Sequence, residues 1–142
     1  MIIIVVSQFN KVPGISQSLQ DSTVKVLEKN NIRYNIVSVP GAIEIPVTIQ
    51  KFLKKDKYKV AIALGCVIKG ETDHYEMVIR SCTDGLSRLA LDLGKPVIQG
   101  VLVSPNDELA IARKNAGKEF GETAIKMLEI FKEDSPADSV AE

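Results

Sequence analysis

The sequence has few of the residues that mark whole classes of protein. It contains two cysteines and one histidine among 142 residues, and its 18 Lys and Arg balance its 18 Asp and Glu. The basic excess or stripe of a nucleic-acid-binding protein is therefore missing. No apolar run approaches the roughly 20 residues that span a bilayer, and Met1–Val6 is too short for a signal peptide. We expect a cytoplasmic protein that binds neither nucleic acid nor membranes.

Several sequence motifs are also missing. No glycine-rich dinucleotide fingerprint or phosphate-binding loop of the Walker type follows the first apolar run, and there is no Gly-x-Ser-x-Gly elbow. Ser7, Gln8 and Asn10 stand where a phospho-receiver domain would carry a carboxylate. Cys66 and Cys82 lie in apolar patterns without metal-ligand spacing, which indicates small buried side chains rather than a disulfide. We expect no metal site.

What the sequence does contain is an alternation of apolar runs and helical patterns. The four runs are Ile2–Val6, Arg33–Val39, Val60–Ile68 and Val97–Val103. Three of them are almost continuously apolar, as in parallel strands covered on both faces. Apolar residues at helical spacing follow in Gly14–Asn30, Pro46–Lys55, Thr72–Leu93, Asn106–Lys114 and Gly117–Lys132. The order predicts a three-layer, doubly wound α/β domain over residues 1–132, with a flavodoxin-like four-stranded parallel sheet and helices on both faces. Residues 133–142 are acidic and apolar-poor, which predicts a disordered tail.

Ligands of such sheets bind beyond the carboxyl ends of the strands, and the sequence is unusual there. Lys69–His74 leads from the third strand into the longest helix. Gly70 lets a ligand approach the backbone, and Thr72 could cap the helix, whose first amides form an anion site. A plain capped helix start would look the same. His74, the only histidine, would lie one turn inside this helix, close enough to exchange protons with a ligand held by these amides.

Two other loops reach the same edge. Pro40–Pro46 is bracketed by prolines and carries Glu44, a lone carboxylate that could hold polyol hydroxyls or simply face solvent. Phe9 follows the first strand, where an aromatic ring could stack on a planar ligand. These features predict a site for a phosphate-bearing small molecule.

Four segments together resemble the lumazine synthase family over nearly the whole chain. They are Gln8–Asn10, Pro40–Pro46, Ala63–Tyr75 and Gly100–Leu102. The resemblance implies an enzyme of riboflavin biosynthesis. Such an enzyme condenses 5-amino-6-ribitylamino-pyrimidinedione with 3,4-dihydroxy-2-butanone 4-phosphate to 6,7-dimethyl-8-ribityllumazine, and it releases phosphate and water. Neither a metal nor a cofactor takes part.

The resemblance also implies a role for each site residue. Phe9 would stack on the pyrimidine ring, Ala42 and Glu44 would hold the ribityl chain, and the backbone of Val67 and Ile68 would contact the ring. His74 would transfer protons. The remaining residues would bind the phosphate (Gly70, Glu71, Thr72 and, from a neighbouring subunit, Arg113) or border the ring pocket (Gln99).

This sequence departs from the family pattern at some positions. Ile43 stands where the family often has Phe, Gln99 where it often has an aromatic residue or Asn, and Lys118 is the nearest match to a family lysine. The family implies a homopentamer with shared active sites. Without the N-terminal strand of many shell-forming members, we expect single or paired pentamers rather than a sixty-subunit shell. The alternatives are an archaeal-type riboflavin synthase, which shares the fold but lacks the Gly-Glu-Thr-x-His segment, and a non-catalytic flavin- or lumazine-binding or shell-forming protein.

Overall fold

The computed structural model describes residues 1–70 and 73–132. Four parallel strands lie in the order β2-β1-β3-β4, which is the flavodoxin-like order of a doubly wound sheet. The strands are β1 (Ile2–Ser7), β2 (Tyr34–Val39), β3 (Val60–Ile68) and β4 (Val97–Ser104). The predicted fold class is therefore confirmed. The predicted tail, 133–142, lies outside the described residues.

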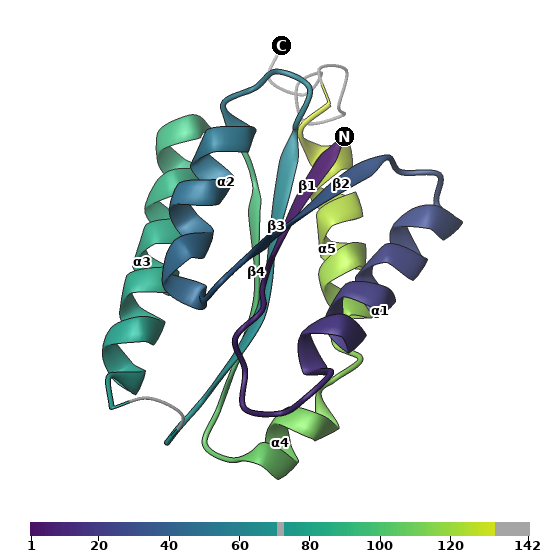
Figure 1. The fold of residues 1–142 in the computed structure, drawn as a ribbon. Coiled ribbons are helices and arrows are strands. Elements are labelled where there is room, and N and C mark those ends of the chain that lie inside the picture. Colours follow the sequence, from purple (N-terminus) through teal and green to yellow (C-terminus); the bar gives the residue numbers. More distant parts are fainter. Residues whose placement is uncertain (71–72, 133–142) are drawn as a thin grey trace.

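Helices cover both faces of this sheet (Figure 1). On one face lie α2 (Ile45–Leu53) and α3 (Tyr75–Leu93), and on the other lie α1 (Ile15–Lys29) and α5 (Gly117–Ile130). The short helix α4 (Asp107–Ala112) lies at the carboxyl edge, and Asn106 caps it by accepting the Leu109 amide at 2.9 Å. None of the helices in the described part of the chain is long and apolar enough to cross a bilayer.

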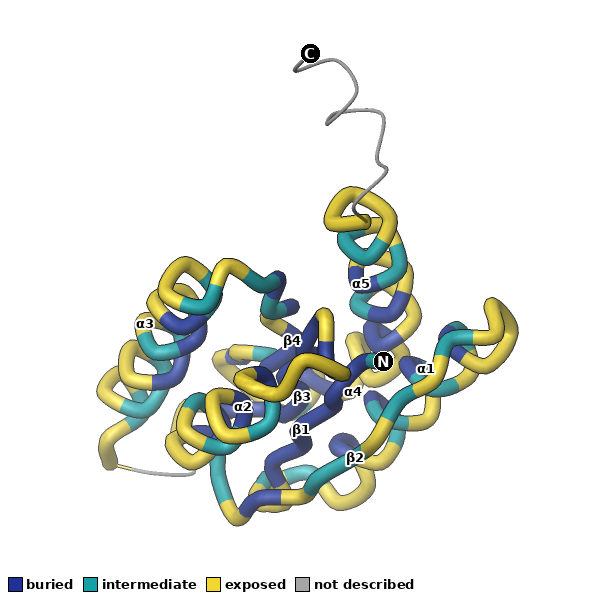
Figure 2. The backbone as a smooth tube through the Cα atoms, turned by 90° about the horizontal axis from the view of Figure 1, so that it is seen from above, coloured by how far each residue is buried: buried dark blue, intermediate teal, exposed yellow. Residues whose placement is uncertain are grey.

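The core has two main layers, one on each side of the strands (Figure 2). All nine residues of β3 are buried, because this central strand is paired on both sides and covered on both faces. Alternate β3 residues face opposite layers: Ala61, Ala63 and Val67 pack toward α2 and α3, whereas Val60, Ile62 and Leu64 pack toward α1 and α5. Cys66 and Cys82 are both buried, as predicted, and both are free thiols.

The start of the longest helix differs from the prediction. The helix α3 begins at Tyr75, with His74 at the N-cap position and Asp73 in a turn, so the expected start at Thr72 is wrong. His74 consequently lies just before the helix rather than one turn inside it. The apolar face of α3 begins with Tyr75 and Val78, both of which pack on the core. Packing rather than a local capping signal therefore decides where the helix starts.

Candidate functional site

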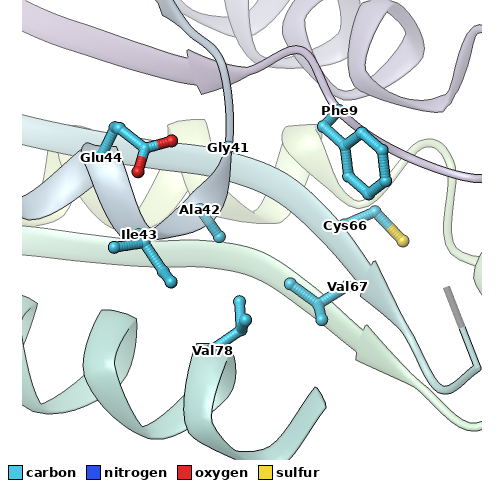
Figure 3. Close-up of a pocket in the computed structure, with 8 residues that line it drawn as sticks. All are labelled: Phe9, Gly41, Ala42, Ile43, Glu44, Cys66, Val67 and Val78. Atoms are coloured by element: carbon cyan, nitrogen blue, oxygen red, sulfur yellow. The ribbon is translucent and has the colours of Figure 1, made fainter. Parts of the chain in front are cut away.

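A pocket at the carboxyl edge of the sheet brings together several predicted site residues. It encloses about 280 Å³ and is lined by Phe9, Gly41, Ala42, Ile43, Glu44, Cys66, Val67 and Val78. Phe9 and Cys66 lie at one end, Glu44 and Ile43 lie at the other, and Ala42 and Val67 lie between them (Figure 3). Four of the predicted binding residues, Phe9, Ala42, Glu44 and Val67, thus share one cavity although they come from three separate segments.

The loop after β1 presents Phe9 to this pocket. The Gln8 amide donates to the Val39 carbonyl at 2.8 Å, and the Phe9 amide donates to the Pro40 carbonyl at 2.9 Å. These bonds extend the pairing of β1 with β2 beyond the last strand residues. The side chain of Phe9 nevertheless stays 60% exposed, which is unusual for an aromatic residue at the end of a fully buried strand. An exposed ring held on a fixed backbone is suited to stacking on a planar ligand.

The loop after β2 forms the opposite wall. Residues Ala42–Glu44 make one turn of 3-10 helix, which runs directly into α2. Ala42 is buried against the core, whereas Ile43 and Glu44 are exposed at the pocket. Among the described lining residues, Glu44 is the one that carries a charge. The pocket is therefore mainly apolar with a single carboxylate, which suits a planar ring that carries hydroxyl groups.

β3 supplies the floor of the pocket. Val67 lines it, whereas the neighbouring Ile68 is fully buried in a cluster with Ile15 and Ala110 on the other face. The side chain of Ile68 is thus outside the pocket, and only its backbone could reach a ligand. Gly65 allows close packing here, because a Cβ at this position would meet the Ser7 hydroxyl and force that side chain to move. That hydroxyl is buried and has no hydrogen-bond partner among the described residues.

The segment after β3 carries the predicted phosphate and proton-transfer residues. Gly70 is exposed and has a φ of +94°, in the left-handed region that favours glycine. His74 is exposed, and its carbonyl accepts the Val78 amide at 2.9 Å, so it lies one helical turn before a residue that lines the pocket. Glu71 and Thr72 lie outside the described residues.

Three residues that the family resemblance indicates lie away from this pocket within one chain. Gln99 lies on the edge strand β4 and borders a separate depression of about 330 Å³, lined also by Thr83, Leu86, Ser87, Ala90, Leu91 and Val97. Arg113 follows α4 and is exposed, with its guanidinium 3.4 Å from the Glu119 carboxylate. Lys118 borders a third depression between α1 and α5. The structure thus places the three residues apart from Phe9 and Glu44.

Sequence reasoning missed two lining residues. It treated Cys66 and Val78 as core side chains, and both do pack in the core as well as border the pocket. For Val78, the available signal was its position four residues after His74, on the same side of the helix. No group of three or more His, Cys, Asp or Glu within residues 1–70 and 73–132 could hold a metal ion.

Comparisons with known proteins identify the family. A sequence model of 6,7-dimethyl-8-ribityllumazine synthase matches residues 1–132. The enzymes of that name from Paraburkholderia phymatum and Burkholderia multivorans are 41% and 39% identical to this chain over 128 residues, covering 87% of the chain and 73% of each relative. Among solved structures, a flavodoxin from the domain Archaea aligns with 88% of this chain and 99% of its own chain, at 11% identity and a TM-score of 0.39. A likeness this weak supports no inference. The family match and the identities show that the chain belongs to the 6,7-dimethyl-8-ribityllumazine synthase family, enzymes of riboflavin biosynthesis.

Proposed function

We propose that the pocket at the carboxyl edge is the active site of a lumazine synthase. There the chain condenses 5-amino-6-ribitylamino-pyrimidinedione with 3,4-dihydroxy-2-butanone 4-phosphate to 6,7-dimethyl-8-ribityllumazine, phosphate and water. The observation that carries this proposal is the convergence of Phe9, Ala42, Glu44 and Val67 on one cavity. These are residues that the family resemblance assigns to the pyrimidine substrate.

The pocket divides between the ring and the ribityl chain of that substrate. The exposed ring of Phe9 stacks on the pyrimidine, and the backbone at Val67 and Ile68 contacts its polar edge. Glu44, at the other end of the cavity, accepts hydrogen bonds from ribityl hydroxyls beside Ala42. The separation of an aromatic end from a carboxylate end supports this orientation.

The second substrate requires an anion site and a proton carrier. Imine formation, loss of phosphate and ring closure all move protons, and the attacking amine is already a nucleophile. His74 is exposed beside the start of α3 and carries the protons. The exposed backbone of Gly70, together with Glu71 and Thr72, binds the phosphate. Much of the rate enhancement comes from holding the two substrates together.

A neighbouring subunit completes each site. Glu44 is the one charged residue among the described lining residues, so the cation for a phosphate group must come from outside the cavity. Arg113 and Gln99 of the adjacent subunit supply the missing side of the site in a homopentamer, whose head-to-tail contacts repeat around a ring. The depression beside Gln99 supports such a contact, because it is lined mostly by apolar side chains and Leu91 at its border is 84% exposed.

One assay separates this proposal from its alternatives. Purified protein is mixed with both substrates, and the fluorescence of the lumazine product is followed. A lumazine synthase produces it, whereas a riboflavin synthase or a non-catalytic flavin-binding protein does not.

Inorganic phosphate should compete with the butanone phosphate and not with the pyrimidine, since only the butanone phosphate carries a phosphate group. Competition against the pyrimidine would show that the anion site is misplaced.

A further inference from the structure

One carbonyl oxygen holds both ends of the segment that carries His74. The Ser104 carbonyl accepts the Lys69 amide at 3.0 Å and the Tyr75 hydroxyl at 3.3 Å. A carbonyl oxygen has two lone pairs and can accept both bonds at once. The chain just after β3 and the first residue of α3 are therefore tied to a single atom of β4.

That atom belongs to a fixed part of the molecule. Ser104 is buried and forms the last pair of the β3–β4 register, opposite Ile68. Its side-chain hydroxyl donates to the Asn106 carbonyl at 2.6 Å, and Asn106 in turn caps α4. The Ser104 carbonyl is thus fixed by the sheet on one side and by a capped helix on the other.

Tyr75 is well suited to transmit this constraint. Its ring packs against the core layer under α2 and α3, and its hydroxyl extends to Ser104. Burial raises the pKa of Tyr75, and the neighbouring Cys66 and Glu76 raise it further, so the hydroxyl keeps the proton that it donates. His74 is joined to Tyr75 by one peptide bond, and the imidazole position therefore depends on where Tyr75 is held.

We propose that the Tyr75 hydroxyl is a positioning group for His74, which fixes the start of α3 to β4 so that the imidazole is held at the rim of the pocket. This inference rests on the proposed role of His74. The 3.3 Å separation is long for a bond from a hydroxyl, which places its contribution among modest neutral hydrogen bonds. Catalysis is sensitive to such a group, because small displacements of a reacting residue lower the rate.

A double-mutant cycle tests the proposal. Tyr75→Phe removes the hydroxyl and keeps the ring. Alone, it should lower kcat by about three- to tenfold, the size expected for one hydrogen bond, with the KM for the pyrimidine unchanged. In a His74→Ala background the same change should have no further effect on kcat, because the group that it positions is gone.

A second tyrosine provides a matched control. The Tyr58 hydroxyl is also hydrogen-bonded, because its oxygen accepts from the side-chain amide Nδ2 of Asn35 at 2.6 Å, but it lies at the opposite edge of the sheet, before β3 begins. Tyr58→Phe should leave kcat unchanged. Melting temperatures of all variants show whether each remains folded at the assay temperature.

Different outcomes overturn different claims. Equal losses from Tyr75→Phe in both backgrounds, or no loss in the wild-type background, would overturn the positioning role and leave the role of His74 intact. A His74→Ala protein with wild-type turnover would instead remove His74 from the mechanism, and the inference about Tyr75 with it. Lumazine formation by the wild-type protein tests the proposed function independently of both.

Discussion

Mixing two impaired variants tests whether each active site is built from two subunits. His74→Ala removes the proposed proton carrier, and Arg113→Ala removes the cation that a neighbour would contribute. Neither change should disturb the fold. Both side chains are exposed, and the 3.4 Å ion pair of Arg113 with Glu119 is a surface contact that contributes less than about 1 kcal/mol. A loss of activity would therefore reflect the site.

The size of the expected recovery follows from the geometry of a ring. Loss of a charge-assisted bond to phosphate costs about 1.5–3 kcal/mol, which corresponds to roughly 10- to 150-fold in kcat/KM for the butanone phosphate. If Arg113 acts across the interface, a site in a mixed ring is intact when its His74 comes from an Arg113→Ala subunit and its Arg113 comes from a His74→Ala subunit. With equal amounts assembled at random, each requirement is met about half the time, so about a quarter of the sites recover.

The assay compares co-expressed variants with each variant alone by lumazine fluorescence, after native mass spectrometry has shown that the rings are mixed. The control pairs His74→Ala with the double variant His74→Ala/Arg113→Ala, a mixture that cannot form an intact site. Mixed rings that show no more activity than the mean of the two single variants would place Arg113 in the same subunit as its site or outside the mechanism. An active monomer would also refute the shared site.

Three further predictions concern catalysis and stability. His74→Ala alone should lower turnover by up to about 10²-fold with little change in substrate affinity, as is usual for a general acid–base group. Steady-state kinetics measure both quantities, and unchanged turnover would contradict the prediction. Gly65→Ala should lower the free energy of unfolding in urea by about 1–3 kcal/mol, because the new Cβ meets the Ser7 hydroxyl. Adding Ser7→Gly should restore much of that stability. A lack of rescue would mean that the collision is not the cause. Burial raises the pKa of Cys82 to about 11, so the unfolded thiol loses its proton first as the pH rises. The protonated Cys82 thiol therefore contributes its full stabilisation of the folded state below about pH 9, and this stabilisation is lost toward pH 11. The melting temperature should therefore fall over that range, and it should fall less in Cys82→Ala.

The fold could be predicted from the sequence because its strongest signals report how whole strands are buried, not how single residues are arranged. Continuous apolar runs such as Val60–Ile68 require burial on both faces, and a strand with that requirement belongs in the middle of a parallel sheet. The start of α3 depended instead on a local signal, and there the prediction failed. A threonine that could cap a helix was outweighed by the packing of Tyr75 and Val78 against the sheet.

The candidate site was predictable to the extent that one chain determines it. Phe9 and Glu44 converge because the carboxyl ends of parallel strands meet at one edge, a rule that needs no coordinates. Cys66 and Val78 were missed because an apolar residue on a buried strand or helix face carries no sign that a cavity borders it. Gln99 and Arg113 came from family resemblance, and no periodicity in the sequence relates them to a pocket in another subunit.

The charges around the pocket support the proposal that one chain provides only part of the site. A carboxylate such as Glu44 suits a polyol and repels a phosphate, so the two substrates cannot share the same end of the cavity. We therefore expect the phosphate to bind at the rim, near the exposed backbone of Gly70. A rim site is also the part of a pocket that a neighbouring subunit can reach. In the proposed site, phosphate binding at the rim and a contribution of Arg113 from a second subunit would both keep the phosphate away from the Glu44 carboxylate.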